Sequence, residues 1–142
     1  MDREEIIRRY ILEYDIEVPE ERFREEYDYI RAEMLHRMRY DTLAGGDHHF
    51  FADDELNAMD EEIRKAALFE AKEGLVLRDI IRKQSFTVTR EELEAEAAAM
   101  AERQSTSIEL IRRFFGEDLA MLEGDIKKQK ARDYIVAEAS RK

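Results

Sequence analysis

Apolar residues recur along this chain at the spacing of an α-helix, and almost no stretch alternates in the manner of a strand. In the first segment Ile7, Ile11 and Tyr14 fall three or four residues apart, which predicts a helix with one buried face. The same spacing predicts helices over about 2–14, 19–43, 53–83, 90–104, 108–115 and 117–139. The predicted fold class is therefore all-α, with long helices.

An elbow between two helices occurs twice, over residues 10–23 and again over residues 80–93. The matched positions are Ile11 with Ile81, Val18 with Val88, and Glu21 with Glu91. In the first copy Pro19 favours an extended residue before it and suits the start of a helix. In the second copy Thr89 and Glu92 have the spacing of a capping box. Each copy thus predicts a helix end, a short extended segment and a new helix.

Glycines and small polar residues mark the other predicted boundaries. The pair at 45–46 ends the second helix, since glycine tolerates the left-handed conformation. Asp53 or Asp54 can cap the next helix, which is predicted to run unbroken to about Lys83. Gly74 within that helix destabilises it by about 1 kcal/mol relative to Ala. We therefore expect a close helix crossing at Gly74.

The C-terminal part contains three further signals. Thr106 and Glu109 form a second capping-box pattern, which predicts the start of a short apolar helix. Gly116 is predicted to break that helix. The segment 127–130 is polar all round, so we expect it to lie in solvent within the last helix.

The positions of the apolar runs predict one elongated domain with two helical arms on a shared base. The first arm covers about 19–73 and the second about 89–130. The base is assembled from 6–14, 74–84 and 131–139. Few of the long helices can be buried on more than one face, because 42% of the residues are charged.

Charge and composition exclude several classes of function. The net charge of −11 argues against binding to nucleic acid or to anionic membrane surfaces, both of which attract Lys and Arg. The sequence contains no cysteine, which removes disulfides and thiolate chemistry. No apolar run approaches the roughly 20 residues that span a bilayer. The N-terminus lacks the features of a signal peptide, so we expect a cytoplasmic protein.

No sequence pattern indicates catalysis or a cofactor. Asp47, His48, His49 and Asp53 are candidate metal ligands by residue type, but adjacent histidines lack the spacing of helical zinc ligands. Phosphate-binding loops, nucleophile elbows and zinc-protease motifs are not found. We therefore expect no enzyme activity, no metal and no cofactor.

Three segments resemble the C-terminal domain of bacterial trigger factor, namely 15–23, 74–83 and 88–93. Their order and spacing agree over about residues 6–139, and the helical architecture is also similar to the peptide-binding domain of SurA-type chaperones. The resemblance implies a domain that binds unfolded or nascent polypeptide without ATP. The ribosome-docking and FKBP-type isomerase domains of that family find no counterpart in the sequence. Ribosome binding would therefore need those domains in the full protein.

Apolar residues on the arms are the predicted peptide-binding residues. On the first arm they are Met34, Met38, Phe50, Phe51 and Met59. On the second arm the resemblance implies Met100, Leu110, Phe114 and Phe115. Flexible methionine and exposed aromatic side chains suit irregular apolar partners. For each of them, packing in the core is the competing interpretation.

Two functions remain open at this point. The first is a chaperone domain whose apolar patches bind unfolded polypeptide. The alternative is a structural helical module for oligomerisation or adaptor binding, in which the apolar faces cover one another. A homodimer is one of the assemblies left open. Suppression of the aggregation of an unrelated protein separates the two.

Overall fold

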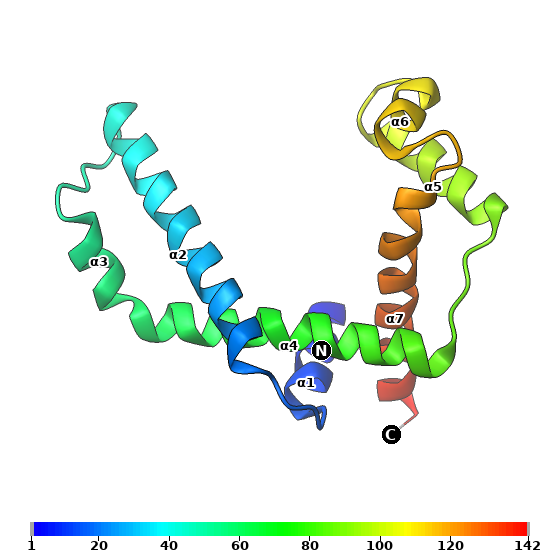
Figure 1. The fold of residues 1–142 in the computed structure, drawn as a ribbon, viewed down its shortest axis with the longest axis horizontal. Helices are drawn as coiled ribbons and strands as arrows, with labels where there is room; N and C mark the ends of the chain where they lie inside the picture. The colour runs from blue at the N-terminus through cyan, green and yellow to red at the C-terminus, as the bar shows by residue number, and fades with distance from the viewer. Residues whose placement is uncertain (1, 142) are drawn as a thin grey trace. The chain divides into compact units, whose positions relative to one another are not determined.

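The computed structural model describes residues 2–141, and this part of the chain is all-α without strands. The elements in order are α1 (Arg3–Glu13), α2 (Glu20–Leu43), α3 (Ala52–Ala58), α4 (Asp60–Gln84), α5 (Arg90–Arg103), α6 (Ile108–Phe115), the 3-10 turn η1 (Ala120–Leu122) and α7 (Glu123–Ser140). Figure 1 follows them along the chain. The all-α prediction is confirmed.

The chain divides into two compact units. Unit I is Ile11–Val76, and unit II is Met1–Tyr10 together with Leu77–Lys142. Unit I holds α2, α3 and the first part of α4, while unit II holds the remainder of α4 and α5 to α7. The predicted arrangement of two arms on a shared base stays a prediction, and the two units are described separately below.

The core of unit I is apolar and narrow. Its buried side chains are Ile11, Leu56, Ile63, Ala67, Ala71 and Val76. α2 and α3 pack against each other, and in Figure 1 they are joined by the loop at the end of α2. α2 itself contributes no fully buried residue. Polar bridges therefore supplement the packing of α2.

Three polar side chains connect α2 to the start of α4. The Tyr27 hydroxyl donates to the carboxylate of Asp60 at the start of α4. Arg64 Nε donates to the same carboxylate at 2.7 Å, and its guanidinium lies 5.2 Å from the centre of the Tyr27 ring. The hydrogen bonds from Tyr27 and then from Arg64 lower the pKa of Asp60.

The prediction of one unbroken helix from Asp53 to Lys83 is wrong, because the chain bends at Met59 between α3 and α4. The stripe that predicted it continues at helical spacing through the bend, so spacing alone could not reveal it. In this stripe Leu56, Ile63 and Ala67 are buried, while Met59 at the bend is 39% exposed. The bend also brings Asp60 to Tyr27.

Two local predictions in the same region are also wrong. Neither Asp53 nor Asp54 caps α3, because Phe51 occupies the N-cap position and makes no side-chain cap. Gly74 does not mark a close crossing, since a Cβ added there would meet nothing within 4 Å. The glycine lies on the exposed side of α4, and we have no structural account of it.

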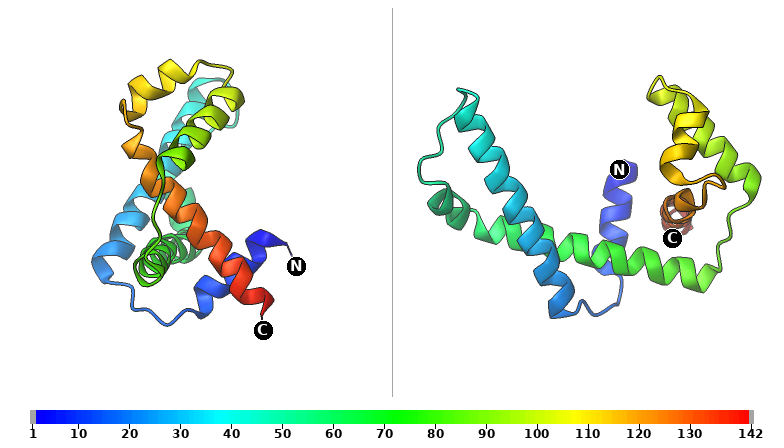
Figure 2. Two further views of the ribbon diagram at one scale, coloured as in Figure 1. Left: turned by 90° about the vertical axis from the view of Figure 1, so that its right-hand side faces the viewer. Right: turned by 45° about the horizontal axis from the view of Figure 1, so that its top comes forward.

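Unit II is organised around one cluster of buried residues. Ala97 and Ala101 of α5 contact Ile111 of α6, together with Leu119 and Leu122. The small alanines allow α6 and η1 to approach α5 closely. Figure 2 shows α6 lying against α5. α7 adds the buried Ala131 and Ile135 further along.

The repeated elbow is confirmed at both positions. α1 ends at Glu13 and α2 begins at Glu20, while α4 ends at Gln84 and α5 begins at Arg90. The second elbow carries the predicted capping box between Thr89 and Glu92. In the first elbow Pro19 is the N-cap residue and makes no side-chain cap. Backbone restriction by proline thus replaces the hydrogen-bonded box.

A lysine of α7 fastens the second elbow. Lys130 Nζ donates to the Thr87 carbonyl and pairs with Glu92 Oε2, both at 2.7 Å. The hydrogen bond from Lys130, followed by that from the Thr89 backbone, lowers the pKa of Glu92. The prediction that 127–130 lies wholly in solvent is therefore wrong at Lys130, whose side chain reaches across to α5.

Two boundaries in unit II differ from those predicted. Ser107, not Thr106, caps α6 and accepts from the Leu110 backbone N–H. The last helix begins at Glu123 rather than Glu117, because the chain first turns through Leu119 with φ at +60°. That turn buries both Leu119 and Leu122 in the cluster, which a continuous helix from Glu117 need not do.

Three helices end in the same hydrogen-bonded motif, with a left-handed residue just beyond the helix. That residue is Gly45 after α2, Ser85 after α4 and Ser105 after α5, with φ of +82°, +54° and +52°. After α5, the Thr106 N–H bonds the Ala101 carbonyl at 2.9 Å, and the other two ends repeat this pattern. Gly45 fulfils the predicted helix stop. The two serines adopt this backbone against the preference of L-residues.

Replacing these serines by glycine should stabilise the protein. Ser85→Gly and Ser105→Gly each remove the strain of a left-handed L-residue, offset in part by the greater freedom of glycine in the unfolded chain. We expect each to raise the free energy of unfolding by about 0.5–1 kcal/mol in urea denaturation. The control Ala98→Gly, on the exposed face of α5, should lower it by about 1 kcal/mol. A loss of stability in both serine variants would contradict this account.

Candidate functional site

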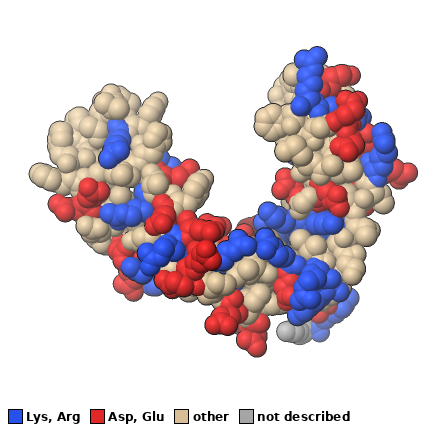
Figure 3. All heavy atoms as spheres, in the orientation of Figure 1, with Lys and Arg blue, Asp and Glu red and all other residues tan. Residues whose placement is uncertain are grey.

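Large apolar side chains lie in solvent where α2 gives way to the loop that follows it. Leu43 is 87% exposed, and Phe50 and Phe51 are 77% and 74% exposed. Tyr40, one turn before Leu43, is exposed as well. We call Tyr40, Leu43, Phe50 and Phe51 the loop patch. In Figure 3 this end of unit I, at the upper left, is mostly free of charged side chains on the face shown.

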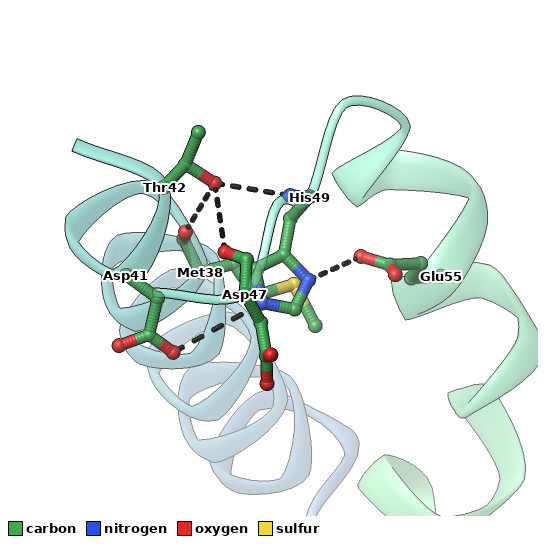
Figure 4. A network of polar contacts seen from close by, with 6 residues as sticks. All are labelled: Met38, Asp41, Thr42, Asp47, His49 and Glu55. Carbon is green, nitrogen blue, oxygen red and sulfur yellow. Dashed lines mark hydrogen bonds and ion pairs between the residues drawn. The ribbon is translucent and has the colours of Figure 1, made fainter. Parts of the chain in front are cut away.

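Polar contacts hold the loop in this conformation (Figure 4). Thr42 Oγ1 accepts from the His49 backbone N–H at 3.0 Å, and its hydroxyl is 3.1 Å from the Met38 carbonyl. The imidazole of His49 contacts Glu55 Oε2 of α3 through Nδ1 at 2.8 Å. Its Nε2 faces Asp41 of α2 at 3.9 Å. The loop is thus tied to both flanking helices, while its phenylalanines remain outside.

The first-arm candidates separate by exposure. Phe50 and Phe51 lie in solvent, and the ring of Phe50 stacks on His48 with centroids 5.4 Å apart. Met34 and Met38 of α2 are half-buried, and Met59 is at the bend between α3 and α4. All five belong to unit I. Their role in binding stays a prediction.

The second-arm candidates also fall into an exposed pair and a pair packed against the core of unit II. Leu110 and Phe114 lie one turn apart on α6, and both are exposed, Phe114 to 75%. We call these two residues the α6 patch. Phe115 and Met100 instead pack against the buried cluster of unit II. The adjacent rings of Phe114 and Phe115 meet edge to face at 4.9 Å, so one ring is anchored and the other is presented.

An ion pair fixes the orientation of α6. Arg112 pairs with Glu94 of α5, and its Nη1 donates to the Glu117 carbonyl at 3.2 Å. Arg112 therefore ties the helix to α5 on one side and to the following turn on the other. Leu110 and Phe114 remain on the solvent side of α6.

Sequence reasoning missed Leu43, the most exposed large apolar residue among those described. Leu43 lies in the last turn of α2 just before the 45–46 glycine pair, beyond the stripe of the helix. The signal that could have identified it is an apolar residue at a helix end whose one apolar neighbour three or four positions away, Tyr40, is itself outside the stripe.

The remaining surface offers little for catalysis. Among residues 2–141, no group of three or more His, Asp or Glu side chains is placed to hold a metal ion. One recess in unit II is lined by Arg90, Arg112, Glu117 and Asp118, which suits water rather than an apolar ligand. No described helix combines the length and apolar character needed to cross a membrane. The exposed apolar side chains are the main chemical feature.

Comparison with known proteins gives one consistent result. The family model of the bacterial trigger factor protein (TF) C-terminus matches residues 2–137. Trigger factor of Bacillus cereus (strain B4264) is 28% identical over 138 residues, which are 97% of this chain and 32% of the relative. Trigger factor of Bacillus pumilus is 28% identical over 134 residues, 94% of this chain and 31% of the relative. The chain spans about a third of the length of the curated relatives it matches. No solved structure matches it.

The two phenylalanines of α6 should differ sharply in their effect on stability. Phe115→Ala removes contacts with the buried cluster and should lower the free energy of unfolding by about 2–3 kcal/mol. Phe114→Ala removes a mostly exposed ring and should change it by less than about 0.5 kcal/mol. Urea denaturation measures both. Equal losses in the two variants would show that α6 is docked differently.

Proposed function

Because this chain belongs to the trigger factor C-terminal family, a family of chaperone domains, we propose that it binds unfolded polypeptide segments without ATP. The observation that carries the proposal is the exposure of large apolar side chains on ordered helices and on a loop held by hydrogen bonds. Such side chains are unfavourable in water and gain free energy when a partner covers them.

The loop patch and the α6 patch are the proposed primary contacts. Fully burying a Leu or Phe side chain stabilises a complex by about 1.5–3 kcal/mol, and these residues retain most of that surface. Several such contacts within one patch give useful affinity even when each is weak, because one client segment can engage the neighbouring side chains of that patch together. Contacts of this kind require no particular client sequence.

The half-buried candidates have a supporting part in this proposal. Methionine adapts its shape to irregular partners, which suits surfaces that receive varied clients. We propose that clients touch Phe50, Phe51, Leu110 and Phe114 first, and then Met34, Met38, Met59, Met100 and Phe115 where those side chains are accessible. The order follows the exposure of each side chain.

The clients and compartment we propose follow from the family. Nascent and unfolded polypeptides are the proposed clients, and the cytoplasm is the proposed location. The arms at about 19–73 and 89–130, with their base, are the proposed framework. Prolyl isomerisation and ribosome binding are outside the proposal, because the match covers about a third of each relative.

Aggregation of a heated, unrelated client, followed by light scattering without ATP, tests the proposal. The wild-type chain should suppress scattering. The triple variant Leu43→Ser, Phe50→Ser, Phe51→Ser should need at least about fivefold more protein for the same effect, since it loses three apolar contacts. Circular dichroism checks that the helices are retained.

A matched triple variant is the control. Leu12→Ser, Tyr29→Ser and Leu68→Ser also remove three exposed apolar side chains from unit I, but outside the loop patch. This variant should suppress scattering like the wild type. A wild-type chain without effect would contradict the proposed function and favour the structural module. Equal losses in both triple variants would contradict the assignment to the loop patch.

A further inference from the structure

His49 lies at the junction of α2, the loop and α3, and it precedes the two exposed phenylalanines directly. Its side chain is only 19% exposed, in contrast to Phe50 and Phe51. The ring contacts Glu55 at 2.8 Å and faces Asp41 at 3.9 Å, so it bridges carboxylates of two helices. The restrained imidazole of His49 therefore directly precedes two phenylalanine rings that lie in solvent.

The backbone of His49 is fixed as well. Its N–H donates to Thr42 Oγ1, and the Thr42 hydroxyl lies within hydrogen-bond distance of both the Met38 and the Asp47 carbonyls, at 3.1 and 3.4 Å. Figure 4 shows these contacts converging from α2 on one side, with Glu55 on the other. Both the main chain and the side chain of His49 are therefore restrained.

Without these restraints, nothing in the loop between Gly46 and Ala52 would hold the two phenylalanine rings in water. Apolar rings on a free loop would turn toward the nearest apolar surface, which lowers their exposure. The rings would then have to leave that surface before they could contact a client. The free energy needed to reorder the loop would weaken binding. A loop already held in its presenting conformation avoids this cost.

We propose that His49 is a positioning residue, which locks the loop between α2 and α3 so that Phe50 and Phe51 stay presented to a partner. In this role His49 does not touch the partner itself. It acts on binding through the position of Phe50 and Phe51. The consequence for client binding rests on the proposed function, whereas the consequence for the loop does not. The two can therefore be tested separately.

Three variants separate the side chain of His49 from its surroundings. His49→Ala removes the contacts to Glu55 and Asp41. His49→Asn keeps a donor near the position of Nδ1, so it can still bond Glu55. His48→Ala is the matched control. It removes the imidazole next to His49 in the sequence, which is exposed and stacks on Phe50.

Limited proteolysis by chymotrypsin at Phe50 and Phe51 measures the loop directly. The rate for each variant is divided by that for a short synthetic peptide of residues 46–55 with the same substitution. His49→Ala should be cleaved about tenfold faster than the wild type, because a charge-assisted hydrogen bond is lost. His49→Asn and His48→Ala should stay within about twofold of the wild type. Cleavage of His49→Ala at the wild-type rate would overturn the inference, whatever the client experiments show.

A double-mutant cycle tests the link to client binding. With a labelled, permanently unfolded client, His49→Ala should weaken affinity about three- to tenfold in the wild-type background. It should have no effect when Phe50→Ser and Phe51→Ser are already present, because the residue acts through those rings. Equal losses in both backgrounds would overturn the positioning role. If the wild type binds no client, the proposed function fails, and proteolysis alone decides the role of His49.

Discussion

The structure depends on burying narrow apolar stripes on helices whose other faces are charged. The buried residues within 2–141 are aliphatic or alanine, with no buried polar or charged residue among them. Each stripe can serve only one or two neighbours, so helices pack in small groups rather than around one broad core. The apolar side chains of the loop patch and of the α6 patch lie largely in solvent. Their exposure is a consequence of the same constraint that builds the fold.

Polar contacts then fix the orientation of helices that are only weakly held by their apolar stripes. α2 has no buried residue, and Tyr27 and Arg64 meeting at Asp60 hold it against α4. In unit II, Lys130 fastens the second elbow and Arg112 fastens α6. These contacts are exposed or half-exposed, so individually each contributes little to stability. Their value is geometric, because they set the direction of helices that present apolar residues.

Periodicity predicted most of the helices, and Pro19 and the Thr89–Glu92 box predicted both elbows, since these depend on residues close in sequence. The bend at Met59 was missed because the stripe keeps its spacing across it. The turn at Leu119 depends on the cluster it fills, and the choice of Ser107 over Thr106 as a cap depends on where the α5 motif ends. Those features are decided by packing between segments.

In the candidate site, too, some features follow from the local sequence and others depend on packing between segments. Phe50 and Phe51 lie in solvent in the loop after the glycine pair, and not in the core, which was the competing interpretation for both. Phe114 and Phe115 could not be separated from sequence, because neighbours on a helix point about 100° apart and only the position of α5 decides which is covered. His49 looked like a candidate ligand by residue type, and its contacts instead tie the loop to two helices.

Nuclear magnetic resonance with an unlabelled unfolded client tests the central claim most directly. Selective labelling of Leu and Ile methyl groups and Phe rings reports on both patches and on the core at once. The signals of Leu43, Phe50, Phe51, Leu110 and Phe114 should shift or broaden as client is added, while those of the buried Ile11, Ile111 and Ile135 should not. Client binding that leaves the patch signals unchanged would contradict the account.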